Sequence, residues 1–210
     1  MKSQTITRKW YDETGERCLR FYKKSRDNEI IQLKDLLEKI PRKVRILDAG
    51  CGFGKPVAKF LSQKGYQVTG IDISSKLISQ ARKSTPKAKF KIMSMYDLKF
   101  PARTFNAIVS FFALLHLEKS KVQRIFKNFN KILKDRGYLL FSVNRGKKEG
   151  YFEFLGKKVF FSEFTKKEIE EILRRSGFRI IWRRDFFFKT PEGSKEHQLY
   201  YFVQKEKVRK

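Results

Sequence analysis

The 210-residue sequence has few of the residues that mark several common protein classes. It contains two cysteines and two histidines, so neither a disulfide framework nor a metal site is expected. The longest uncharged apolar run, residues 107–117, is too short to span a bilayer, and the first residues lack the apolar stretch of a secretory signal. We therefore expect no membrane association. The two cysteines, Cys18 and Cys51, give no disulfide framework and favour a reducing, cytoplasmic location.

Acidic residues are also scarce. The chain has 22 of them against 49 basic residues, which gives a formal net charge of +27. Such an excess favours an acidic partner, most often nucleic acid. A biased overall composition explains the same numbers, because the basic residues are dispersed along the chain and form no arginine-rich arm. Both interpretations stay open, and the oligomeric state is not indicated by any pattern.

Glycine is infrequent, yet three of the 12 glycines stand at alternate positions after Asp48: Gly50, Gly52 and Gly54. An apolar run precedes them, and Pro56 with an apolar helical pattern follows, which predicts a buried strand, a glycine turn and a helix. Glycine suits a backbone that takes a positive φ or approaches a ligand closely. The third glycine of the dinucleotide fingerprint and the Lys-Ser/Thr pair of a P-loop are both missing, so a pyrophosphate is not the obvious ligand.

A second strand, predicted for residues 67–71, ends in Asp72. In a doubly wound sheet it lies beside the first strand, so Asp72 falls at the same edge as the glycine turn, where a carboxylate can accept hydrogen bonds from ribose hydroxyls. The motif Asp-x-Gly-x-Gly-x-Gly, with an acidic residue ending the next strand, resembles the class I S-adenosylmethionine-dependent methyltransferases. The resemblance extends over roughly residues 9–205.

Alternating patterns along the chain fit one α/β domain spanning residues 1–210. A helical lid would occupy 1–40, a cofactor-binding core 41–145, and an acceptor-side hairpin, helix and closing strands 146–210. The resemblance implies a Rossmann-like fold, with a seven-stranded, mostly parallel sheet, an antiparallel C-terminal hairpin and helices on both faces. Helices are predicted at 9–24, 28–39, 56–64, 75–84 and 119–133. Strands are predicted at 44–49, 67–71, 89–93, 105–112, 138–143, 178–188 and 198–203, with an aromatic hairpin at 150–162, a capping box from Thr165 to Glu168 and a turn at 191–193.

The resemblance also implies a set of residues that contact S-adenosylmethionine. The glycine turn would lie under its methionine and ribose parts, Asp72 would bind the ribose, and Ile73 would pack on the adenine. The predicted cofactor-binding residues are Asp48, Gly50, Cys51, Gly52, Asp72, Ile73, Ser94, Met95 and Ser110, with Phe111 beside them.

The adenine end departs from the family pattern. Where the family often has an aspartate, the segment 93–101 carries Ser94, and Asp97 comes three residues later. Either Ser94 takes the role or the loop shifts to present Asp97. The backbone amide of Met95 can serve the adenine ring in both cases.

Two residues are candidates for the chemistry on the acceptor side. His116 follows the fourth predicted core strand, where the family lines the mouth of the methyl-transfer pocket, and it is either a general base or a packing residue. Tyr11 belongs to the helical lid and either faces the acceptor or anchors the lid. Aromatic residues between 149 and 164 would form another wall of the acceptor site.

These patterns predict an S-adenosylmethionine-dependent methyltransferase that acts on a small molecule. Methyl transfer needs chiefly cofactor binding, alignment of the acceptor and exclusion of water, so a missing catalytic triad does not argue against it. An RNA methyltransferase acting on tRNA is the alternative that the net charge favours. A non-catalytic binding protein on the same fold is the alternative that the missing adenine carboxylate favours.

Overall fold

The computed structural model describes residues 2–21, 27–189, 193 and 195–206. Within these residues, the sheet has nine strands, two more than predicted. Seven of them follow the order β3-β2-β1-β4-β5-β9-β8, and among these seven only β9 runs antiparallel to its neighbours; the other two form a hairpin at the end of β5. The expected Rossmann-like α/β fold is thus confirmed. The seven strands are β1 (Arg45–Ala49), β2 (Gln67–Asp72), β3 (Lys89–Ile92), β4 (Phe105–Ser110), β5 (Leu133–Arg145), β8 (Phe178–Lys189) and β9 (Lys195–Lys205).

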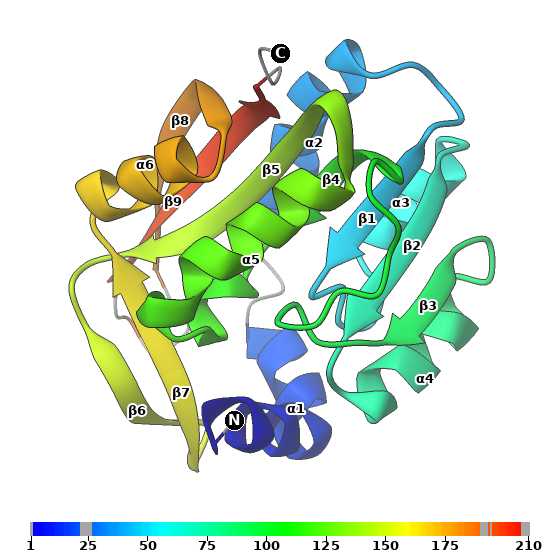
Figure 1. Ribbon diagram of the computed structural model, residues 1–210. Coiled ribbons are helices and arrows are strands. Elements are labelled where there is room, and N and C mark those ends of the chain that lie inside the picture. The colour runs from blue at the N-terminus through cyan, green and yellow to red at the C-terminus, as the bar shows by residue number, and fades with distance from the viewer. Residues whose placement is uncertain (1, 22–26, 190–192, 194, 207–210) are drawn as a thin grey trace.

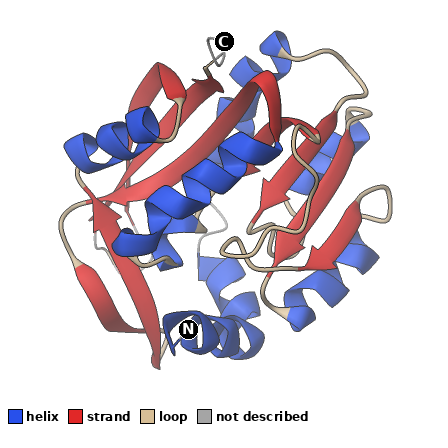
Figure 2. Cartoon of the chain, viewed as in Figure 1, coloured by secondary structure: helices blue, strands red, loops and turns tan. Residues whose placement is uncertain are grey.

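Helices cover both faces of this sheet (Figures 1 and 2). The buried residues fall into two clusters, one for each face: α5 and α6 pack on one, and α2, α3 and α4 on the other. The helices are α1 (Lys2–Phe21), α2 (Asp27–Lys39), α3 (Val57–Gln63), α4 (Ser75–Ser84), α5 (Lys119–Ile132) and α6 (Lys166–Arg175). None of the described helices is long and apolar enough to cross a membrane.

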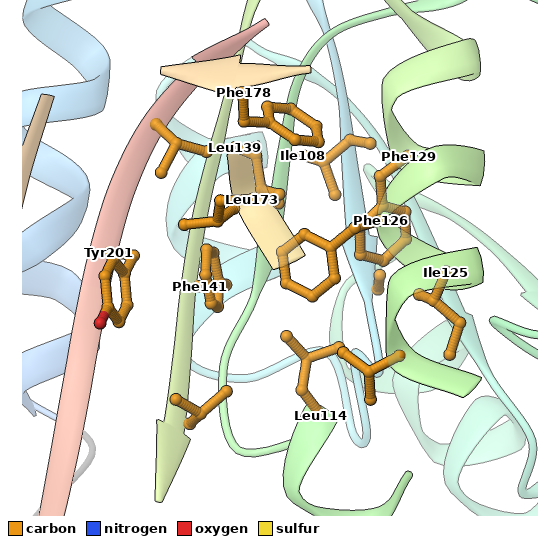
Figure 3. Close-up of a cluster of buried hydrophobic side chains, with 14 of the residues drawn as sticks. Ile108, Leu114, Ile125, Phe126, Phe129, Leu139, Phe141, Leu173, Phe178 and Tyr201 are labelled. Atoms are coloured by element: carbon orange, nitrogen blue, oxygen red, sulfur yellow. The ribbon is translucent and has the colours of Figure 1, made fainter. Parts of the chain in front are cut away.

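Several aromatic side chains lie in the cluster under α5 and α6 (Figure 3). The Phe126 ring packs edge-on against Phe141 and Phe178, at centroid distances of 5.0 and 6.3 Å. Phe141 in turn stacks on Tyr201 of β9, 5.3 Å away with nearly parallel rings. Such pairs stabilise a core beyond the area that they bury. The result is a firmly packed sheet whose carboxyl edge is held in place.

A hairpin of β6 (Glu149–Phe154) and β7 (Lys157–Phe164) extends from the carboxyl end of β5. Helix α1 crosses this same edge and contacts β7, α4 and the short 3-10 turn Leu114–His116 (Figure 1). Trp10 anchors α1: it is 2% exposed, its ring stacks on Phe154 at 5.6 Å, and its Nε1 donates to the Phe154 carbonyl at 3.0 Å. The helix and the hairpin together cover the ends of the central strands.

Three details differ from the predicted elements or lie beyond them. Helix α1 begins at Lys2 rather than near residue 9, because polar contacts with distant segments hold its first turns, among them Ser3 Oγ to Glu118 Oε1 at 2.5 Å. Strand β5 is longer than predicted and pairs with both β9 and β7. The predicted turn at 191–193 falls mostly outside the described residues.

Candidate functional site

A cavity opens at the carboxyl edge of the sheet, beneath α1. Its open space is about 1180 Å³, counting the part that is continuous with solvent. Its wall is mostly apolar and is built from the glycine turn, the ends of β2 and β4, the loop after β3, α1 and the β6–β7 hairpin.

The glycine turn after β1 shapes one wall of the cavity. The amides of Gly50 and Cys51 both donate to the Ile71 carbonyl, at 2.8 and 3.0 Å, which ties the turn to β2. Gly50 has φ +81°, and a Cβ there would lie 2.3 Å from the Cβ of Ala113, so only glycine fits. Gly52 has φ +51°, but a Cβ there would meet no protein atom within 4 Å. The space beside Gly52 is therefore open.

Asp72 ends β2 and lies in the cavity wall. Its Oδ2 accepts from the Gly52 amide and its Oδ1 from the Ser74 amide, both at 3.0 Å. Burial raises the pKa of Asp72, and the backbone amides that donate to its carboxylate oppose that rise. A carboxylate held this way presents its remaining lone pairs in a fixed direction, which suits a ligand with neighbouring hydroxyl groups.

Other predicted cofactor residues take different positions. The cavity wall includes Ile73, Met95 and Phe111, but not Asp48, Cys51, Ser94 or Ser110. Asp48 is buried at the end of β1, and Ser110 Oγ donates to the Ala49 carbonyl at 2.8 Å. The Cys51 side chain packs in the core on the α3 side, where burial raises the pKa of its thiol. The turn meets the cavity through Gly50 and Gly52, on either side of Cys51.

The loop after β3 presents neither an aspartate nor a glutamate to the cavity. The Asp97 side chain is 73% exposed and pairs with Lys99 at 3.5 Å. Ser94 Oγ accepts from the Tyr96 amide at 3.1 Å and from Nε2 of Gln4 on α1. Ser94, rather than Asp97, is therefore the loop residue that is hydrogen-bonded to a side chain of the cavity wall, that of Gln4.

Helix α1 lays one face over the cavity. Five of its residues line the wall at spacings of three or four, and sequence reasoning singled out only one of them, Tyr11. They are Gln4, Thr7, Tyr11, Gly15 and Cys18. The regular spacing is the signal that could have found them, but it becomes visible only once the helix is known to begin at Lys2. Polar contacts hold the same helix to several other segments, among them Ser74 Oγ to Asp12 Oδ1 and Lys157 Nζ to Glu13 Oε2, both at 2.5 Å.

Tyr11 and His116, the two candidates for the acceptor side, meet in the cavity wall. Nδ1 of His116 lies 2.8 Å from the Phe160 carbonyl, which can only accept, so Nδ1 carries the proton. Nε2 is then the acceptor for the Tyr11 hydroxyl, also at 2.8 Å. Burial is the main cause that lowers the pKa of His116 to about 4. At neutral pH the pair is therefore an uncharged imidazole that orients a tyrosine hydroxyl.

Comparisons with known proteins show which proteins this chain resembles. A family profile described as a methyltransferase domain matches residues 46–137. YqeM of Bacillus subtilis, a methyltransferase by its name, is 34% identical over 111 residues, which are 50% of this chain and 44% of that protein. This chain spans about half the length of the curated relatives that it matches first.

Solved structures extend the likeness over most of the chain. An S-adenosylmethionine-dependent methyltransferase from Methanosarcina mazei is 25% identical, with a TM-score of 0.74 over 81% of this chain and 96% of that one. The magnesium protoporphyrin IX methyltransferase from Synechocystis, crystallised with bound S-adenosylhomocysteine, is 18% identical. Its TM-score is 0.76 over 97% of this chain and 100% of that one, a likeness of fold.

Proposed function

We propose, on the premise that this chain carries a class I S-adenosylmethionine-dependent methyltransferase domain, that it methylates a small-molecule acceptor in the cavity beneath α1. When bound, S-adenosylmethionine supplies an activated methyl group. The chain's own task is then to hold that cofactor, to align the acceptor and to exclude water.

The residues at the carboxyl edge fit this cofactor. The fixed carboxylate of Asp72 suits the two ribose hydroxyls, and the open space beside Gly52 suits a ligand that follows the turn. Ile73, Met93 and Met95 provide an apolar surface next to Asp72 for a flat base. We therefore assign the adenosine to the β1–β2 side of the cavity and the acceptor to the side of the hairpin.

The cover that α1 and the hairpin form over the cavity is the observation that carries the choice of a small molecule. Helix α1 and the β6–β7 hairpin cover the space beyond the cofactor residues, and Phe112, Phe154 and Phe161 line it. A lidded aromatic pocket suits an apolar or aromatic acceptor that enters whole, and the lid excludes water from the transfer. The low cysteine content fits our expectation of a reducing, cytoplasmic setting.

We assign the Tyr11–His116 pair to the orientation of the acceptor. An imidazole whose pKa is about 4 is about three units below a neutral working pH, so loading a proton on Nε2 costs about 4 kcal/mol. The Tyr11 hydroxyl, held by Nε2, can instead align the acceptor atom by accepting or sharing a hydrogen bond. This role needs no change of charge at His116.

The net charge of +27 favours RNA as a second candidate acceptor. Transfer of label from radioactive S-adenosylmethionine into a metabolite extract and into total RNA, measured near physiological salt, separates the two. We expect label in the small-molecule fraction, and none with the Asp72→Ala variant. Label that recurs in one RNA species and disappears in Asp72→Ala would establish the RNA activity instead. Cofactor binding without transfer to either fraction would favour a non-catalytic binding protein.

A further inference from the structure

The cavity face of α1 carries two polar side chains, Gln4 and Thr7, one turn apart. Thr7 is 2% exposed, and its Oγ1 has no hydrogen-bond partner among the described residues. Buried hydroxyl groups in native structures are rarely left so, because the lost hydration is costly. Both residues line the cavity. The inner face of α1 therefore offers polar groups to a ligand in the cavity.

The Gln4 amide is oriented by the loop after β3. Its Nε2 donates to Ser94 Oγ, which also accepts from the Tyr96 amide at 3.1 Å. With its nitrogen bound there, the amide has its oxygen left as an acceptor. The neighbours of Ser94 in sequence, Met93 and Met95, line the cavity. Gln4 thus reaches the same end of the cavity as the apolar surface beside Asp72.

We propose that α1 reads the adenine of the cofactor. The Gln4 amide oxygen accepts a hydrogen bond from the 6-amino group, and Ser94 is the positioning residue that holds the amide. This rests on the proposed function, in which Asp72 binds the ribose and so places the attached purine against Ile73, Met93 and Met95. The loop offers no carboxylate for that amino group, because Asp97 is exposed and paired with Lys99. The acceptor comes instead from the lid helix.

Thr7 extends this contact. Its hydroxyl gains the missing partner from the same ligand, one turn further along α1 toward Tyr11. Because both contacts come from α1, a bound adenosyl group adds to the contacts that hold this helix over the acceptor side of the cavity.

The test compares S-adenosylhomocysteine with its analogue that lacks the 6-amino group, both titrated by calorimetry. For the wild-type protein we expect the natural compound to bind roughly three- to tenfold more tightly, the effect of one neutral hydrogen bond. Gln4→Ala should bring this ratio close to one, by weakening only the natural compound. Ser94→Ala should lower the ratio as well, and Ser94→Thr, which keeps the hydroxyl, should restore it.

Thr7→Val, which keeps the shape, should weaken both compounds by a similar factor, whereas the matched change Thr5→Val on the exposed side of α1 should weaken neither. A ratio that stays at its wild-type value in Gln4→Ala overturns the assignment of the adenine contact while leaving the proposed function intact. Failure of the wild-type protein to bind either compound overturns both. Melting temperatures of all variants show whether a loss of binding is a loss of folding.

Discussion

Acidification should destabilise this protein through one buried residue, His116. Burial lowers its pKa from 6.5 to about 4 in the folded state, whereas the unfolded chain keeps the ordinary value. Between these two values the unfolded chain binds a proton that the folded protein does not. Stability from this group is therefore complete above pH 6.5 and falls as the pH drops toward 4.

The magnitude follows from the gap between the two pKa values. A gap from 6.5 to about 4 corresponds to roughly 3 kcal/mol in total, of which about 2 kcal/mol is lost between pH 7.5 and pH 5. Urea unfolding of the wild type and of His116→Asn at both pH values isolates this part. Asparagine can still donate to the Phe160 carbonyl but does not titrate. The wild type should lose about 2 kcal/mol more than the variant, or roughly 4–8 °C in Tm.

The chain's other histidine provides the control. His197, which lies 2.8 Å from Asp185, leaves His116 untouched when it is changed, so His197→Asn should keep the additional loss. Equal pH dependence in the wild type and in His116→Asn would refute the burial argument. So would an NMR titration in which the His116 ring protonates near pH 6.5.

Three further predictions concern the cavity. Gly50→Ala should destabilise the fold by at least about 1–3 kcal/mol, because its Cβ would lie 2.3 Å from the Cβ of Ala113. Gly52→Ala, whose Cβ meets open space, should lose cofactor affinity with a much smaller fall in Tm. Thermal melts and cofactor titrations of both variants test this difference. Ser94→Asp should keep or improve affinity for S-adenosylmethionine, because a carboxylate is the stronger acceptor for the Gln4 amide that Ser94 holds. Loss of binding in Asp97→Ala would instead show that Asp97, and not Ser94, is the loop residue that serves the adenine. Tyr11→Phe should lower the rate of methyl transfer about tenfold and leave cofactor affinity unchanged, and a parallel fall in affinity would contradict its role on the acceptor side.

Local sequence signals predicted the central sheet and its edge well. The glycine turn and Asp72 follow from motif and spacing, and α4 spans the predicted residues 75–84 because Ser74 caps it, accepting from the Leu77 amide at 3.1 Å. The capping box of Thr165 and Glu168 is confirmed for the same reason. Each of these features is decided by residues close together in the chain.

Contacts between distant segments could not be predicted in the same way. Tyr11 and His116 are 105 positions apart, and only the docking of α1 on the 3-10 turn brings them within 2.8 Å. The start of α1 at Lys2 was not predicted for a related reason. The first residues of the helix are mostly polar, and contacts with Glu118 and Ser94, rather than an apolar stripe, hold them in place. Ser110 shows the converse: its position suggested a ligand contact, but its hydroxyl bonds the backbone of β1.

The central claim is that the edge formed by the glycine turn and Asp72 binds S-adenosylmethionine. Calorimetric titration of the wild type, Asp72→Ala and Asp97→Ala with this cofactor tests it most directly. We predict micromolar binding by the wild type and by Asp97→Ala, a matched change at an exposed carboxylate. Asp72→Ala should bind roughly tenfold to a hundredfold more weakly, since it loses charge-assisted hydrogen bonds worth about 1.5–3 kcal/mol. Equal affinity in Asp72→Ala and the wild type, or no binding by the wild type, would contradict the account.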